Sequence, residues 1–173
     1  MTCSCLLLIL IFTGTGQAVF SNESPHSVTE QIKEINANII FMRHALAPGY
    51  GDPEEFNLNS CETQRNLDLN GQQQAINIGN HFRSENLKFD AIYSSQWCRC
   101  LETAKLLNFN IEVPFAGLNS FFEEHAPRKE TLGLLNRKMS QLDGSTLTLM
   151  VTHQVVISAI TGIAVSSGQM IAY

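Results

Sequence analysis

The chain alternates short apolar runs with longer amphipathic stretches, and this alternation predicts strands and helices in turn. Three runs, 37–42, 89–94 and 146–152, are short, apolar and bounded by polar residues, which is typical of buried strands. A further short strand is expected at 169–173. The chain therefore predicts a sheet of several strands with helices between them.

Helices are expected at residues 70–82, 96–107, 128–142 and 154–162. The first has apolar residues at 75, 78, 79 and 82, the spacing of one helix face, and Asn70 is its expected N-cap. Ser95 is the expected cap of the second helix, and the apolar stripe of the third is assigned to core packing. Strands that alternate with helices at this spacing favour an α/β fold with a mainly parallel sheet.

The N-terminus is expected to be an export signal. Residues 1–12 form an apolar run too short to span a bilayer, and the small residues 14–18 follow it, so cleavage is predicted after Ala18. The start contains no Lys or Arg, which leaves a buried N-terminal strand or an uncleaved anchor as alternatives. The cleaved form would be periplasmic or secreted, with no stable membrane insertion.

Residues 19–36 are polar and are expected to form a leader with one helical turn near 28–35, followed by a single domain at 37–173. The size of 173 residues, 44% of them hydrophobic and 16% charged, suits one modest core. A formal net charge of -5 argues against sequence-independent binding to nucleic acid or anionic membranes. Positive charge for an anionic ligand must therefore be local.

Three cysteines would remain after cleavage, at Cys61, Cys98 and Cys100. In an oxidising compartment, a disulfide from Cys61 to either of the other two is expected, leaving one thiol unpaired. A zinc site is the rival interpretation, but it needs four ligands, and the Cys98-x-Cys100 spacing does not match the usual paired-cysteine arrangement. The disulfide is preferred, and its pairing stays open.

Polar residues follow the three predicted buried strands. Arg43 and His44 come after the first strand, and His153 comes after the third. Arg99 comes shortly after the second strand, at the start of the helix that follows it. Ligands of open α/β sheets bind beyond the carboxyl ends of the strands, so these side chains should converge. Guanidinium groups pair with phosphate oxygens, a neutral histidine can attack phosphorus, and a second, cationic histidine can stabilise the developing charge. The pattern favours a phosphorylated substrate and requires no metal or cofactor.

Four segments resemble the histidine phosphatase (phosphoglycerate mutase-like) superfamily. Residues 41–45 resemble its Arg-His-Gly signature, with Ala in place of Gly, and residues 94–104 resemble its Ser-Ser-x-x-x-Arg-x-x-x-Thr-Ala segment. Residues 151–154 resemble the closing Ser-His-Gly element, with Thr and Gln replacing Ser and Gly. Residues 64–71 are similar to the Arg-x-Leu-x-x-x-Gly segment. The resemblance covers about 37–162 and implies a three-layer sandwich with a mainly parallel central sheet.

The resemblance also implies roles for individual residues. His44 would be the phosphorylated nucleophile, Arg43 and Arg99 the phosphate clamp, and His153 the second histidine of the pocket. Arg65 is either a third phosphate contact near the mouth or a member of a loop ion pair.

The proton donor departs from the family pattern. Family members often carry an acid in a Leu-x-Glu element, but Leu118-Asn119-Ser120 puts serine there. Glu123 is the preferred substitute and Glu124 the alternative, because a leaving alkoxide needs a proton. Both glutamates could equally be exposed loop charges.

Three functions are compatible with these residues. The first is a phosphomonoesterase that acts outside the cytoplasm on a small phosphorylated substrate. The second is a mutase or a phosphohistidine protein phosphatase, which the short chain and the export signal disfavour. The third is a catalytically weak phosphate-binding member of the fold, which the displaced acid favours.

Overall fold

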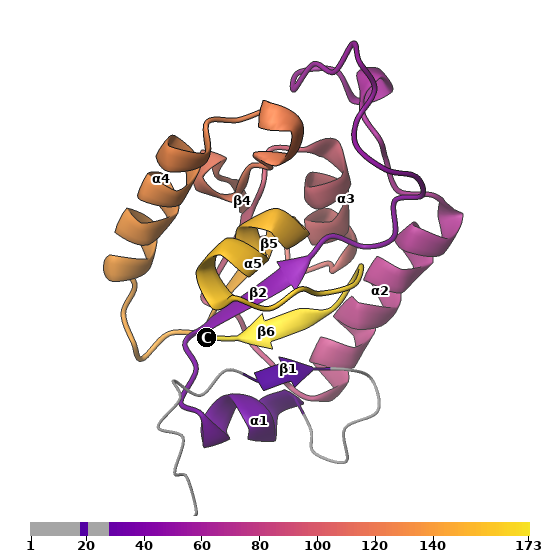
Figure 1. The fold of residues 1–173 in the computed structure, drawn as a ribbon. Coiled ribbons are helices and arrows are strands. Elements are labelled where there is room, and N and C mark those ends of the chain that lie inside the picture. The colour runs from indigo at the N-terminus through magenta and orange to yellow at the C-terminus, as the bar shows by residue number, and fades with distance from the viewer. Residues whose placement is uncertain (1–17, 21–27) are drawn as a thin grey trace, which may run out of the picture.

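The computed structural model describes residues 18–20 and 28–173, and a six-stranded sheet lies at its centre (Figure 1). The strands are β1 (Ala18–Phe20), β2 (Ile39–Arg43), β3 (Ala91–Ser94), β4 (Glu112–Pro114), β5 (Thr148–Thr152) and β6 (Met170–Ala172). The helices are α1 (Val28–Glu34), α2 (Leu69–Ser84), α3 (Cys98–Leu106), α4 (Arg128–Ser140) and α5 (Gln154–Thr161). Three short 3-10 turns are η1 (Cys61–Thr63), η2 (Ala116–Leu118) and η3 (Phe122–Glu124).

The sheet is mainly parallel, as the alternating pattern predicts. Its order is β1-β6-β2-β5-β3-β4, with β2, β5, β3 and β4 parallel, β6 antiparallel to β2, and β1 antiparallel to β6. Arg43 pairs with Thr152, and Ser94 pairs with Val151. The three central parallel strands therefore end at nearly the same level, which brings the residues after them to one edge of the sheet.

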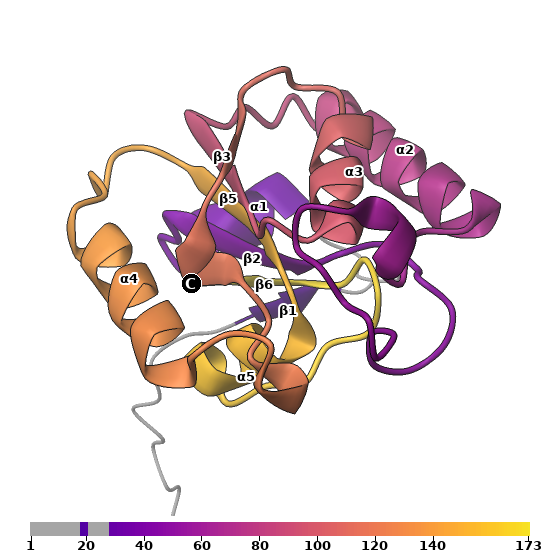
Figure 2. The same ribbon diagram turned by 90° about the horizontal axis from the view of Figure 1, so that it is seen from above.

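Helices cover both faces of the sheet, which confirms the α/β sandwich (Figure 2). Along β2 the side chains alternate: Ile40 and Met42 pack on one face with residues of α1, α2 and α3. Ile39 and Phe41 pack on the other face with residues of α4 and α5. β5 is buried along its whole length and β2 as far as Met42, as expected for a parallel sheet with both faces covered.

Two predicted helix starts are wrong. α2 begins at Leu69, and its N-cap is Asp68 rather than Asn70, because an Asp68 Oδ1 oxygen accepts the Gly71 N–H at 2.7 Å. α3 begins at Cys98 rather than Gln96. The backbone N–H of Gln96 instead donates to Asn119 Oδ1 at 2.9 Å, which keeps the chain extended there, and Ser95 belongs to the site rather than to a cap.

The edge strand β4 was not predicted, because its residues are half-buried or exposed and carry no apolar alternation. The segment before β2 does form a helix, α1, close to the expected turn. Ile32 of α1 is buried in the core, and the Thr29 hydroxyl donates to the Glu85 carbonyl at 3.2 Å.

Ala18, the residue before the predicted cleavage point, pairs with Ala172 as part of β1. The predicted signal peptide otherwise lies in residues 1–17, outside the described residues. Within 18–20 and 28–173, no helix is long and apolar enough to cross a membrane.

Candidate active site

A cavity of about 300 Å³ lies at the carboxyl edge of the central strands. Its walls come from the ends of β2 and β5, the long loop between β2 and α2, the start of α3 and the segment after η2. The lining residues are Arg43, His44, Gly49, Tyr50, Gly51, Asp52, Arg65, Arg99, Ser120, Phe122, His153, Gln154 and Val155. Five residues that the sequence singles out thus line one cavity: both histidines and the three arginines.

The two histidines face each other across the guanidinium of Arg99. Their ring centroids lie 5.4 Å apart. Arg99 Nε donates to His44 Nε2 at 3.2 Å, and Arg99 Nη2 lies 3.4 Å from His153 Nδ1. Because arginine has only donors, both histidine nitrogens in these contacts are acceptors.

His44 is held as a neutral imidazole with a defined tautomer. Its Nδ1 lies 2.7 Å from the Ala45 carbonyl oxygen, which can only accept, so the proton is on Nδ1 and the lone pair on Nε2. Burial and the neighbouring Arg99 lower the pKa of His44 to about 3. The unprotonated Nε2 therefore stands beside a cationic anion-binding group, as a nucleophile toward phosphorus requires.

In the free protein, His153 is held neutral as well. Burial, followed by the charge of Arg99, lowers its pKa well below the usual value. Its Nε2 donates to Ser95 Oγ at 2.9 Å, and the Ser95 hydroxyl donates in turn to Asn119 Oδ1 at 3.2 Å. This chain fixes the ring with Nδ1 toward Arg99.

Arg43 and Arg65 have different surroundings. Arg43 Nη1 donates to Gln154 Oε1 at 3.0 Å and to the Val165 carbonyl at 2.9 Å, while its buried Nε has no partner among the described residues. Arg65 donates from Nε to the Gly51 carbonyl at 2.7 Å and from Nη1 to the Ala47 carbonyl. Within the described chain, Arg65 thus bonds backbone carbonyls of the long loop rather than a carboxylate, which disfavours the loop ion pair.

Asp52 is the functional residue that the sequence analysis missed. Its carboxylate pairs with the Arg99 fork, Oδ1 with Nη1 at 2.7 Å and Oδ2 with Nη2 at 3.1 Å. It is the only acidic side chain among the residues that line the cavity. No sequence signal distinguishes it, because the same irregular loop also carries Glu54, Glu55 and Glu62.

Comparison with known proteins shows the family. The profile of the Histidine phosphatase superfamily (branch 1) matches residues 39–132, more than half of the chain. The chain belongs to the histidine phosphatase superfamily. The matched segment includes His44, Arg65 and Arg99 but ends before His153, so the place of the second histidine rests on the geometry of the cavity.

Individual relatives are more distant. A broad-specificity phosphatase of Saccharomyces cerevisiae is 31% identical over 78 residues, 45% of this chain and 30% of that protein. The protein histidine phosphatase SixA, solved in complex with tungstate, aligns with a TM-score of 0.51 at 14% identity over 76% of this chain and 84% of that chain. A SixA structure from Agrobacterium tumefaciens gives 0.49 at 19% identity over 74% and 79%. The first SixA structure shows that the fold is shared.

The two glutamates proposed as proton donors lie outside the cavity wall. Both are exposed, on η3. The Glu123 carboxylate lies against Gly51, where a Cβ atom would stand 2.7 Å from Oε2, and its Oε2 lies 3.8 Å from His125 Nε2. Ser120, which replaces the family acid, is buried and lines the cavity.

The disulfide joins Cys61 to Cys98, with 5.7 Å between their Cα atoms. It links the long loop to the residue directly before Arg99. Among the cysteines that the structure describes, Cys100 is the free thiol, and burial raises its pKa to about 12. In the described part of the chain, no group of three or more His, Cys, Asp or Glu side chains could hold a metal ion.

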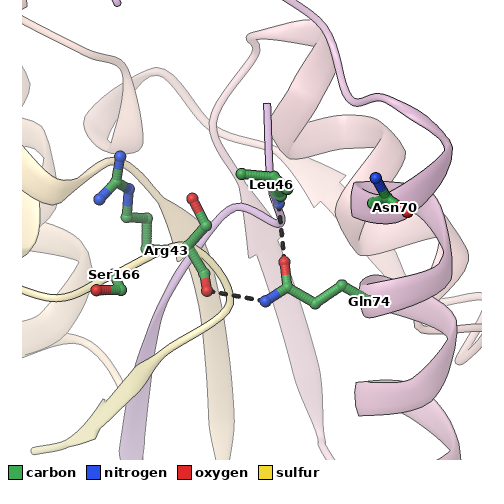
Figure 3. A pocket seen from close by; sticks show the side chains of 6 residues that line it. Arg43, Leu46, Asn70, Gln74 and Ser166 are labelled. Carbon is green, nitrogen blue, oxygen red and sulfur yellow. Dashed lines mark hydrogen bonds between the residues drawn. The ribbon is translucent and has the colours of Figure 1, made fainter. Parts of the chain in front are cut away.

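Arg43 also lines a second hollow, and the residues around this hollow hold the chain that follows His44 (Figure 3). Gln74 of α2 accepts the Leu46 N–H at 2.8 Å and donates to the Ser167 carbonyl at 3.0 Å. Gly71 lets the helix approach so closely that a Cβ there would lie 1.9 Å from the Leu46 carbonyl oxygen. These contacts tie the first two turns of α2 to the segment that follows His44.

Proposed function

We propose that this chain is a phosphatase that hydrolyses a phosphomonoester through a phosphohistidine intermediate on His44. The observation that carries the proposal is the state of His44: its Nδ1 proton is bonded to the Ala45 carbonyl, and its Nε2 lone pair lies at the cavity next to Arg99. Family membership supports the same chemistry.

In the first step, the Nε2 lone pair attacks phosphorus while the ester P–O bond breaks and the leaving oxygen takes a proton. In the second step, water attacks phosphorus and gives a proton back to the group that protonated the leaving oxygen, while the N–P bond breaks and phosphate leaves with Nε2 restored. Arg43, Arg65 and Arg99 carry three positive charges and Asp52 one negative charge, which leaves a double positive charge for a phosphate dianion. We therefore propose that neither metal nor cofactor takes part.

A second candidate, a phosphohistidine protein phosphatase, is favoured by the lack of an unengaged carboxyl group among the residues lining the cavity. A protonated phosphohistidine ring leaves as neutral imidazole and needs no proton from the enzyme, whereas an alkoxide does. SixA, which shares the fold, is named a protein histidine phosphatase. A mutase is less well supported, because the chain offers few insertions to hold a larger substrate.

The first experiment is hydrolysis of p-nitrophenyl phosphate by the purified protein in the presence of a chelator. We expect turnover in the parent and in His81→Ala, whose histidine is exposed on α2, and loss in His44→Ala. When the reaction is quenched, phosphate bound covalently to the protein, labile in acid and stable in alkali, should be found in the parent and not in His44→Ala. A protein that binds phosphate without labelling or turnover would instead be a binding member of the fold.

The leaving group separates the two enzyme candidates and tests the proton donor. An alkyl phosphate needs protonation, so Glu123→Gln or Glu124→Gln should lower its turnover more than that of p-nitrophenyl phosphate if either residue is the donor. Fast release of phosphate from a phosphohistidine peptide, with no detectable alkyl phosphate turnover, would favour the protein phosphatase.

We also propose export, with cleavage after Ala18. The Cys61–Cys98 disulfide supports an oxidising compartment. Cleavage there would retain Val19 and Phe20 of β1. Mass spectrometry of the exported protein should find an N-terminus near Val19, and an intact Met1 would contradict the proposal. The partners expected there are small phosphorylated substrates, not nucleic acid.

A further inference from the structure

We propose that Asp52 is a positioning residue that holds Arg99 with one edge of its guanidinium directed at the phosphoryl site. The proposal rests on the proposed function of the cavity. Asp52 does not belong to any of the segments that resemble the family, and its role follows from the contacts of the two side chains, which are 4% and 3% exposed.

The guanidinium of Arg99 uses its two edges for different partners. The end of the fork, Nη1 and Nη2, is bonded to the two oxygens of Asp52 at 2.7 and 3.1 Å. The side of the fork, Nε and Nη2, faces His44 Nε2 at 3.2 Å and His153 Nδ1 at 3.4 Å. Each edge can bind one oxyanion in a bidentate manner. Asp52 occupies one edge, and the other faces the attacking nitrogen.

Every N–H of Arg99 has a partner. Arginine has five N–H donors, of which two go to Asp52 and two to the histidines. The remaining Nη1 donor bonds the Arg65 carbonyl at 3.2 Å. A phosphoryl group entering between the histidines can take over the two donors that face them, while the other three bonds stay in place. Arg99 can thus bind phosphate without reorienting.

Asp52 is poorly suited to be the missing proton donor. Its carboxylate accepts four N–H bonds, because the Arg65 backbone N–H donates to Oδ1 at 3.0 Å and Trp97 Nε1 donates to Oδ2 at 3.1 Å in addition to the Arg99 pair. A carboxylate has about four acceptor positions, so a proton on either oxygen would oppose an existing donor. Burial alone would raise the pKa of Asp52, but the bonds and charge of Arg99, together with the N–H bonds from Arg65 and Trp97, outweigh it and keep the pKa below the usual value.

The support behind Asp52 is also rigid. Trp97 is 1% exposed and stacks on Phe56 of the same loop, with ring centroids 4.9 Å apart. The Cys61–Cys98 disulfide joins the loop to the residue between Trp97 and Arg99. The loop therefore fixes Asp52 relative to Arg99 through one aromatic contact and one covalent bond.

The test compares Asp52→Asn with Glu54→Gln, which removes the same charge from an exposed position of the same loop. We expect Asp52→Asn to lower kcat by about 100-fold, the effect of a misplaced catalytic group. Inhibition by inorganic phosphate should be unchanged or stronger, because a negative charge is removed from the cavity. Glu54→Gln should behave as the parent does. The loss should be the same for p-nitrophenyl phosphate and an alkyl phosphate.

A double-mutant cycle then tests whether Asp52 acts through Arg99. Lysine has no fork to orient, so adding Asp52→Asn to Arg99→Lys should cause little further loss of kcat. Asp52→Glu, which keeps the charge but moves the carboxylate, should also lower kcat and serves if Asp52→Asn does not fold.

Several results would overturn the inference alone in a parent that is active and depends on His44. One is an unchanged kcat in Asp52→Asn or Asp52→Glu, and another is that the two single-variant losses of kcat multiply in the double variant. A third is that Asp52→Asn weakens phosphate inhibition as much as it lowers kcat. A fourth is a loss of kcat for the alkyl phosphate only, which would make Asp52 the proton donor. An inactive parent, or full activity in His44→Ala, would instead overturn the proposed function, and this inference with it.

Discussion

The carboxyl edge of the sheet and the loop at residues 45–68 contribute to the same cavity by different means. The sheet edge places His44 and His153 directly after two paired parallel strands, so the register of β2 and β5 fixes their relative position. The loop places Asp52 and Arg65 through side-chain bonds to backbone, an aromatic stack and a disulfide. The position of His44, the proposed nucleophile, therefore depends on the core, whereas the positions of Asp52 and Arg65 depend on a few local contacts.

The comparison predicts its largest effect for the nucleophile. His44→Ala should lower kcat by about 10⁴-fold or more, because no other group in the cavity replaces the attacking nitrogen. Arg65→Ala should cost only about tenfold, because Arg99 and Arg43 still hold the phosphoryl group. Steady-state kinetics with p-nitrophenyl phosphate measure both. Equal losses of kcat in His44→Ala and Arg65→Ala would show that the sheet edge and the loop do not differ in their contribution.

The disulfide is expected to matter mainly for the loop. Reducing Cys61–Cys98, which closes 37 residues of chain, should lower the free energy of unfolding by about 3 to 4 kcal/mol in the chain-entropy treatment. Urea denaturation with and without a reductant measures the change. The reductant should not affect Cys61→Ser, which serves as the control. If the parent is equally stable in both conditions, the loop is held by its noncovalent contacts alone.

Acid should destabilise the sheet edge before it affects Asp52. Both cavity histidines have folded pKa values below the unfolded value near 6.5, so the unfolded state takes up protons first and stability falls as pH drops below about 6.5. Each contributes up to about 1.4 kcal/mol per pH unit, and for His44 the loss continues toward its folded pKa of about 3. Asp52 also has a lowered pKa, but its contribution is lost only below about pH 4.

Urea denaturation at intervals between pH 6.5 and 4.5 isolates the histidine contribution. His44→Gln should reduce the slope of stability against pH in this window, while His81→Gln, at an exposed position, should leave it unchanged. A parent whose stability does not change between these pH values would show that the histidines are not held neutral.

The same contrast explains how far the sequence predicts this molecule. The apolar runs predicted the bounds of the three central strands to within about two residues. The polar residues after these strands line one cavity, because parallel strands share a carboxyl edge. The cysteine spacing predicted a disulfide from Cys61 but not whether Cys98 or Cys100 completes it. That choice depends on which way each side chain of α3 points.

Asp52 could not be predicted, because its role comes from a loop without periodicity whose path is set by tertiary contacts. Trp97, Arg99 and the Arg65 backbone all converge on it, and none of them is near it in sequence. The neutral state of His153 in the free protein could not be predicted for a related reason. Its pKa depends on burial and on the charge of Arg99, neither of which a strand-end pattern encodes.

The smallest predicted effect concerns the start of α2, which joins the loop to the helix that braces the nucleophile segment. Asp68→Ala should lower the free energy of unfolding by about 1 kcal/mol, because the Asp68 carboxylate satisfies the Gly71 N–H in the first turn. Asn70→Ala should change it by less than about 0.5 kcal/mol, because Asn70 is an exposed residue inside the helix. Urea denaturation of the two variants at pH 7 compares them. A larger loss of unfolding free energy in Asn70→Ala than in Asp68→Ala would indicate that Asn70 is the N-cap, as the sequence suggested. If Asp68→Ala also lowers kcat, order at the end of the loop is transmitted to the cavity through α2, and the two regions are less independent than their contacts indicate.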